Sequence, residues 1–198
     1  MPAVEFTALL VLAAAMSFSP GPNTTLATTL AANHGLRPSL RFVCAVPFGW
    51  CLLLLTAAGV GALVLAVPAL RWAIKALGIG YLLWLALRLS RAGQLAQAQG
   101  GALAVRFWQG VGLQFVNIKA WLLMLTVVAG WIAGHADAWQ RLAVVLPVMA
   151  FFALSSNLLY ACVGALLRGW LAHGRRLLWF NRLMALLLVM TALWMVAA

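Results

Sequence analysis

Residues 19–23 read SPGPN, and they interrupt an otherwise apolar segment that spans residues 4–32. Proline removes a backbone donor and clashes with the preceding helical turn. Pro20 and Pro22, placed on either side of Gly21, therefore predict that the helix over this segment is broken. Pro22 is well placed as the first residue of a new half-helix, where its missing N–H costs little.

The half-helix that begins after this break is expected to offer an anion site. The N–H groups of Asn23, Thr24 and Thr25 would lack intrahelical partners, and they would carry the positive end of the helix dipole into the membrane. Broken backbone at membrane depth is tolerated where it is buried in protein or lines a wet cavity. The alternative interpretation is a kink used only for packing, since proline and glycine are common in membrane helices.

The composition predicts that the solvent of this chain is lipid. Of the 198 residues, 66% are apolar and only 8% are charged, whereas a soluble domain carries about 25% charged residues. An apolar run of about 20 residues spans a bilayer as a helix. The sequence predicts six such runs, over residues 4–32, 40–67, 70–89, 107–133, 142–167 and 177–197. We therefore expect one all-α polytopic membrane domain, residues 1–198, with a broken first helix and no separate soluble domain.

The basic residues indicate how the chain is oriented, because lysine and arginine are enriched in cytoplasmic loops. The links after the first, third and fifth segments hold nine of them, and the opposite links hold three. The nine are Arg37, Arg41, Arg88, Arg91, Arg106, Arg168, Arg175, Arg176 and Arg182, and the three are Arg71, Lys75 and Arg141. We expect a multi-pass protein of the bacterial inner membrane with both termini in the periplasm. The net charge of +11 follows this topology and does not indicate a nucleic-acid partner.

A polar link at residues 90–106 divides the chain into two groups of three segments, residues 1–89 and residues 107–198. Because three is odd, the second group must be inserted upside down relative to the first. Inverted repeats of this kind are a common way to build a transporter with alternating access. The sequence thus predicts a secondary transporter made of two inverted three-helix repeats.

Polar residues in the second half complete the candidate site. Lys119 lies near the middle of residues 107–133, where a lysine is expensive and usually faces a cavity or a partner. Its counter-charge would be a substrate carboxylate, backbone carbonyls or the C-terminal end of a helix; alternatively, Lys119 snorkels to the membrane interface. Asn117, Gln114 and Asn157 are further candidates for substrate contact, although polar side chains in membranes more often join helices together.

Glycines recur along the apolar segments, and small residues allow helices to approach closely. We expect this role for Gly49, Gly59, Gly61, Gly78, Gly80, Gly110 and Gly112. A further expectation is a homodimer that packs through the small-residue face around Gly130 and Gly134.

Three stretches resemble the LysE/RhtB family of amino-acid exporters, and the resemblance covers essentially the whole chain. Residues 17–50, SFSPGPNTTLATTLAANHGLRPSLRFVCAVPFGW, resemble the family's PGPN segment followed by spaced glycines. Residues 75–89, KALGIGYLLWLALRL, resemble its K-x-x-G-x-x-Y-L pattern. Residues 107–121, FWQGVGLQFVNIKAW, resemble its F-x-x-G…N-P-K segment. The resemblance implies an amino-acid exporter in the lipid bilayer, and we expect neither an enzyme nor a cofactor.

One departure from the family pattern is informative. The usual N-P-K is Asn117-Ile118-Lys119 here, so we expect the second break to be less sharp than the first. The same replacement makes the chain similar to the cysteine/O-acetylserine exporter branch, which implies a small neutral amino acid as substrate. The resemblance also implies coupling to protons, and the apolar segments offer no acid for this. Lys119, His34 or the ionisable groups of the substrate would have to carry the proton.

Two other function classes find less support in the sequence. A metal-cation exporter or channel is the alternative, because distant relatives handle cations. Hard cations need clustered oxygen ligands and soft cations need clustered cysteine or histidine, whereas the apolar segments hold scattered cysteines and no carboxylates. An intramembrane hydrolase needs a nucleophile with an activating base, and no histidine is placed to serve Ser155 or Ser156.

Overall fold

The computed structural model describes residues 1–95 and 105–197, and all of its regular elements there are α-helices. The helices are α1 (Ala3–Phe18), α2 (Pro22–His34), α3 (Leu36–Ala66), α4 (Pro68–Leu95), α5 (Phe107–Val116), α6 (Ile118–Trp131), α7 (Ala138–Leu171) and α8 (Arg176–Ala197). The all-α expectation is therefore confirmed.

Four helices, α3, α4, α7 and α8, are long and apolar enough to cross a membrane by themselves. The helices α1 and α2 form a bent pair, as do α5 and α6, and counting each pair as one span gives up to six spans. Each half of the chain therefore contains one broken pair followed by two long helices. That the halves are inverted relative to each other stays a prediction. The predicted link at residues 90–106 lies partly outside the described residues, and α4 continues to Leu95.

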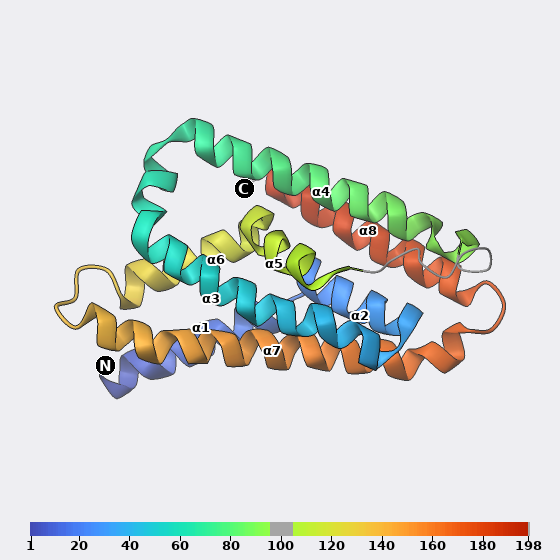
Figure 1. The fold of residues 1–198 in the computed structure, drawn as a ribbon, viewed down its shortest axis with the longest axis horizontal. Helices are drawn as coiled ribbons and strands as arrows, with labels where there is room; N and C mark the ends of the chain where they lie inside the picture. Colours follow the sequence, from blue (N-terminus) through green and yellow to red (C-terminus); the bar gives the residue numbers. More distant parts are fainter. Residues whose placement is uncertain (96–104, 198) are drawn as a thin grey trace.

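The long helices form an elongated bundle, and the two breaks lie inside it (Figure 1). The helices α4 and α8, one from each half, run side by side along one edge of the bundle. Along the opposite edge, α7 packs against both α2 and α3. Extensive contact between the halves brings the residues of the two breaks into one neighbourhood.

The distribution of polar and apolar side chains is reversed relative to a soluble protein. Large apolar side chains point outward, among them Leu166, which is 83% exposed, and Phe151, which is 63% exposed. Polar side chains such as Gln114 and Asn181 are fully buried. Water would not favour this arrangement, whereas in lipid polar groups turn inward to find partners.

Glycine allows close helix approach at four of the seven expected positions. A Cβ atom at each of these four would lie closer to a neighbouring helix than contact allows, and the four are Gly49, Gly61, Gly78 and Gly110. The tightest approach is that of Gly78 in α4 to the backbone carbonyl of Val116 at the end of α5. The expectation is wrong for three positions that have open space around them, namely Gly59, Gly80 and Gly112.

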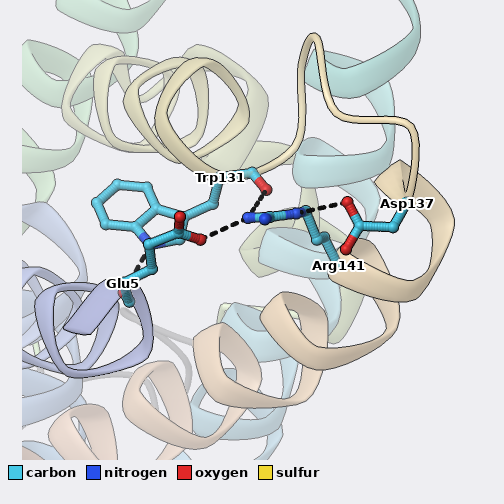
Figure 2. A network of polar contacts seen from close by, with 4 residues as sticks. All are labelled: Glu5, Trp131, Asp137 and Arg141. Atoms are coloured by element: carbon cyan, nitrogen blue, oxygen red, sulfur yellow. Dashed lines mark hydrogen bonds and ion pairs between the residues drawn. The ribbon is translucent and has the colours of Figure 1, made fainter. Parts of the chain in front are cut away.

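The only two acidic residues of the chain meet at one arginine, which is shown in Figure 2. Arg141 at the start of α7 is 7% exposed. Its Nη1 lies 2.7 Å from Glu5 Oε2 in α1, and its Nε lies 2.8 Å from Asp137 Oδ1. The indole Nε1 of Trp131 at the end of α6 donates to the carbonyl of Glu5 at 2.8 Å. This network, the outer clamp, joins one end of each broken pair to α7.

Candidate functional site

The first break lies between α1 and α2, and it forms where the two prolines predict it. The two helices meet at an angle of 50°, and Pro22 is the first residue of α2. The amide of Gly21 donates to Thr24 Oγ1 at 3.0 Å, and the amide of Thr25 donates to the carbonyl of Gly21 at 2.9 Å. The expectation that Thr25 lacks an intrahelical partner is therefore wrong, because its amide makes the first helical bond of α2. The amides of Asn23 and Thr24, at the second and third helical positions, are left without an intrahelical acceptor.

The second break lies at Asn117 between α5 and α6, and it is sharper than expected. The bend is 68°, compared with 50° at the first break, so the expectation of a gentler break without proline is wrong. The physical reason is that side chains satisfy the freed backbone groups. Asn117 Oδ1 accepts from the amide of Lys119 at 3.1 Å and caps α6. Trp121 Nε1 donates to the carbonyl of Phe115 at 2.8 Å, near the end of α5.

Lys119 reaches from the second break to the first. Its Nζ donates to Ser19 Oγ at 2.6 Å, to the Ser19 carbonyl at 3.1 Å and to the Pro20 carbonyl at 3.3 Å. Lys119 thus points into the protein and does not snorkel to the interface. Its partners are one hydroxyl and two carbonyls just past the C-terminal end of α1, where the helix dipole is negative. A Cβ at Gly21 would lie 3.3 Å from Nζ, so the glycine leaves room for the ammonium.

Gln114 holds Asn23 in place by a reciprocal amide pair. Asn23 Nδ2 donates to Gln114 Oε1 at 2.8 Å, and Gln114 Nε2 donates back to Asn23 Oδ1 at 3.1 Å. Trp50 Nε1 also donates to Gln114 Oε1 at 3.0 Å, and Gln114 Nε2 donates to the carbonyl of Gly110 at 2.9 Å. These bonds fix the Asn23 side chain, which leaves its backbone N–H and the second N–H of Nδ2 to offer a ligand.

A cavity of about 20 Å³ lies where the two breaks meet. Seven of the predicted site residues line it, namely Gly21, Pro22, Asn23, Thr24, Asn117, Lys119 and Asn157. The remaining lining residues are Met16, Ser17, Ser19, Trp50, Ala120 and Leu123. Three predicted residues do not line it: Pro20 accepts from Lys119, Thr25 continues α2, and Gln114 supports Asn23 from behind.

Sequence reasoning missed three polar residues of the cavity. Ser17 and Ser19 lie within three residues before the first proline, at the C-terminal end of α1 and on the N-terminal side of the break. Their position beside a predicted helix interruption was a usable signal. Trp50 gave no such signal, because its contact with Gln114 joins residues 64 positions apart.

The charge in the cavity is positive and has no acidic partner. Both acidic residues of the chain belong to the outer clamp and neither lines the cavity. Within residues 1–95 and 105–197, no group of three or more histidine, cysteine or acidic side chains could hold a metal ion. To an anionic group, the cavity offers one ammonium, Lys119, and two free amides at the start of α2.

The sequence of this chain has relatives among known proteins. Residues 14–198 match the family model described as LysE type translocator. The chain belongs to the LysE type translocator family. The cysteine/O-acetylserine efflux protein of Salmonella typhimurium is 32% identical over 178 residues, which cover 89% of each chain. The protein of the same name from Escherichia coli (strain K12) is 30% identical over 180 residues, also 89% of each chain.

No solved structure matches this LysE type translocator. Membership in a family of translocators, together with the apolar helices, identifies the protein as a multi-pass membrane transporter and not an enzyme.

Proposed function

We propose that this translocator exports small amino acids or their derivatives, of the cysteine and O-acetylserine kind, from the cytoplasm. The substrate class follows from the names of relatives that are 30–32% identical along 89% of the chain. The observation that carries the proposal is the position of the Lys119 ammonium beside the free amides that begin α2, in a cavity without an acid.

The physics of this cavity favours a carboxylate. An ammonium buried in a membrane protein is costly unless it is paired, and the carbonyls of Ser19 and Pro20 supply only partial negative charge. The N-terminus of a helix adds positive potential and free N–H donors. A substrate carboxylate that bridges Lys119 and the amides of Asn23 and Thr24 would satisfy all three groups at once.

The size of the cavity bears on the transport cycle. Its volume of about 20 Å³ is enough for about one water molecule and is too small for an amino acid. Binding therefore requires the walls to separate, and the walls come from both halves of the chain. Rocking of one half against the other, as in alternating access, would open the cavity to each side in turn. In this proposal the basic links face the cytoplasm and both termini face the periplasm.

If transport is coupled to protons, the proposal limits which groups carry the exchanged proton. No acidic side chain lines the cavity, so an exchanged proton would reside on Lys119, on His34 or on the substrate. The metal-cation alternative has no observation in its favour, because the cavity is positive and lacks a ligand cluster in the described part of the chain.

Counterflow in proteoliposomes tests the proposal. Vesicles loaded with unlabelled O-acetylserine or cysteine should take up the labelled compound through the wild-type protein. Lys119→Met should slow this uptake by tenfold or more, since hydrogen bonds to charged groups contribute about 1.5–3 kcal/mol. The matched control is Lys75→Met, because Lys75 is half-buried, donates to the Val196 carbonyl in α8 and does not line the cavity. Wild-type uptake that is absent, or Lys119→Met uptake equal to that of the control, would refute the proposal.

A further inference from the structure

Two residues that line the cavity each carry a buried polar atom without a hydrogen-bond partner. The atoms are Ser17 Oγ and Asn157 Oδ1, and both residues line the same cavity as Lys119. Ser17 is 5% exposed and Asn157 is 2% exposed. More than about 90% of buried polar groups in proteins are paired, because an unpaired one loses its hydrogen bonds to water without replacement. Two such atoms on residues that line one small cavity therefore require an explanation.

The orientation of the Asn157 amide is fixed by its own helix. Its Nδ2 donates to the carbonyl of Ala153 at 2.8 Å. The opposite orientation would place two carbonyl oxygens against each other, so the nitrogen must occupy this side. The oxygen Oδ1 is therefore the free end of the amide, and it can only accept a hydrogen bond.

Ser17 also departs from the pattern of its neighbours. Hydroxyl groups within a helix commonly donate to a carbonyl one turn earlier, as Thr28 does to Thr24 and Thr29 does to Thr25. Ser19 donates to the carbonyl of Met16 at 2.9 Å in the same way. The Ser17 hydroxyl lacks such a bond, so it is available to a ligand.

We propose that Asn157 Oδ1 and Ser17 Oγ receive the α-ammonium group of the substrate. This inference rests on the proposed function, in which the carboxylate of the same molecule binds at Lys119 and the start of α2. An α-amino acid carries three ammonium donors next to its carboxylate, and the cavity holds free acceptors together with free donors. The site thus recognises the zwitterion as a whole and not the carboxylate alone.

The neutrality of this acceptor pair sets the substrate class. A carboxylate in place of Asn157 would neutralise the charge of Lys119. The cavity would then no longer repel cations. The amide and the hydroxyl accept from an ammonium and leave the positive charge of Lys119 for the substrate carboxylate. Amines without a carboxylate and metal cations are disfavoured, because Lys119 repels them. Carboxylic acids without an amino group bind weakly, because Asn157 and Ser17 then stay unpaired.

Competition in the counterflow assay tests this pair. The two competitors are cysteine and the same thiol acid without its amino group, mercaptopropionate. The wild type should prefer cysteine by about tenfold or more. Asn157→Leu, which keeps the number and branching of the side-chain heavy atoms and removes the polar ones, should weaken competition by cysteine about tenfold and should leave competition by mercaptopropionate within about twofold. Ser17→Ala should act in the same direction with a smaller change, and it keeps the test valid if Asn157→Leu does not fold.

The matched control is Ser155→Ala, because Ser155 donates to Phe152 and does not line the cavity.

The outcomes separate this inference from the proposed function. Equal loss for both competitors in Asn157→Leu would make Asn157 a structural residue only, and no loss for either would mean that a water molecule is the sole partner of the two atoms. Both results would overturn the ammonium site and leave the carboxylate site standing, provided that Lys119→Met still weakens competition by mercaptopropionate. Failure of the wild type to respond to either competitor would instead refute the proposed function.

Discussion

The two breaks reach similar shapes by different chemistry. At the first break two prolines prevent a continuous helix, and the bend is 50°. At the second break no proline is present, and the bend is 68°. The difference teaches that a membrane helix breaks when its freed backbone groups find partners, whether or not a proline forces it. Asn117 and Trp121 supply those partners at the second break.

The two breaks also contribute different chemical groups to the cavity. The first break leaves amides of α2 free, so its backbone offers binding groups. The second break satisfies its own backbone through Asn117 and Trp121 and presents a side chain, Lys119, to the first. The second break therefore positions Lys119, and a change in the packing around it should reach the cavity through that side chain.

The largest effect is expected where α4 packs on the second break. Gly78→Ala places a methyl group against the backbone carbonyl of Val116 and 2.9 Å from Met195 Cε. A backbone atom cannot rotate away, so the variant should lose about 3 kcal/mol of stability by overpacking. The thermal unfolding temperature in detergent should fall by roughly 6–12 °C.

The control for this prediction lies on the same helix. Gly80 has nothing within 4 Å of an added Cβ, so Gly80→Ala should unfold within about two degrees of the wild type. Equal unfolding temperatures for Gly78→Ala and Gly80→Ala would mean that close packing of α4 does not hold the second break.

Sequence reasoning predicted the first break and not the geometry of the second. Pro20 and Pro22 act through covalent structure, which is readable along the chain. Asn117 and Trp121 act through hydrogen bonds whose existence depends on the final fold. The same limit applies to glycine, since Gly78 and Gly80 look alike in the sequence and only Gly78 meets another helix.

The candidate site was predictable to the same extent. Residues that are unusual in an apolar helix, such as Lys119 and Asn157, were found because their cost in lipid requires a reason. Ser17 was missed because a serine in a membrane helix is ordinary, and its unpaired hydroxyl is visible only in the fold. The role of Gln114 as a support for Asn23 required the long-range contact itself.

A smaller effect is expected when proline is introduced at the second break. Ile118 is the first residue of α6, and Asn117 before it has φ −90° and ψ 101°, which suits a residue that precedes proline. Ile118→Pro should therefore keep its unfolding free energy within about 1 kcal/mol of the wild type. Leu122→Pro, one turn later in the same helix, should lose about 3 kcal/mol. If thermal unfolding shows equal losses for the two variants, the second break is not a true helix start.

The smallest effect concerns the outer clamp, which joins the far ends of both broken pairs. The hydrogen bond from Arg141 holds the pKa of the Asp137 carboxyl below its usual range. The folded protein then binds fewer protons than the unfolded chain near pH 4, so the contribution of Asp137 is complete at higher pH and is lost as the pH falls through the lowered pKa.

Asp137→Asn should accordingly lower the unfolding temperature by about 1–3 °C at pH 6, a small change because the carboxyl is partly exposed. The difference from the wild type should shrink on acidification below about pH 4. In an Arg141→Gln background the same substitution should have no effect, because the partner of the carboxyl is gone. A temperature difference that is independent of pH, or that persists without Arg141, would show that Asp137 acts on the start of α7 alone. Asp137 would then not help to fasten the two broken pairs to α7.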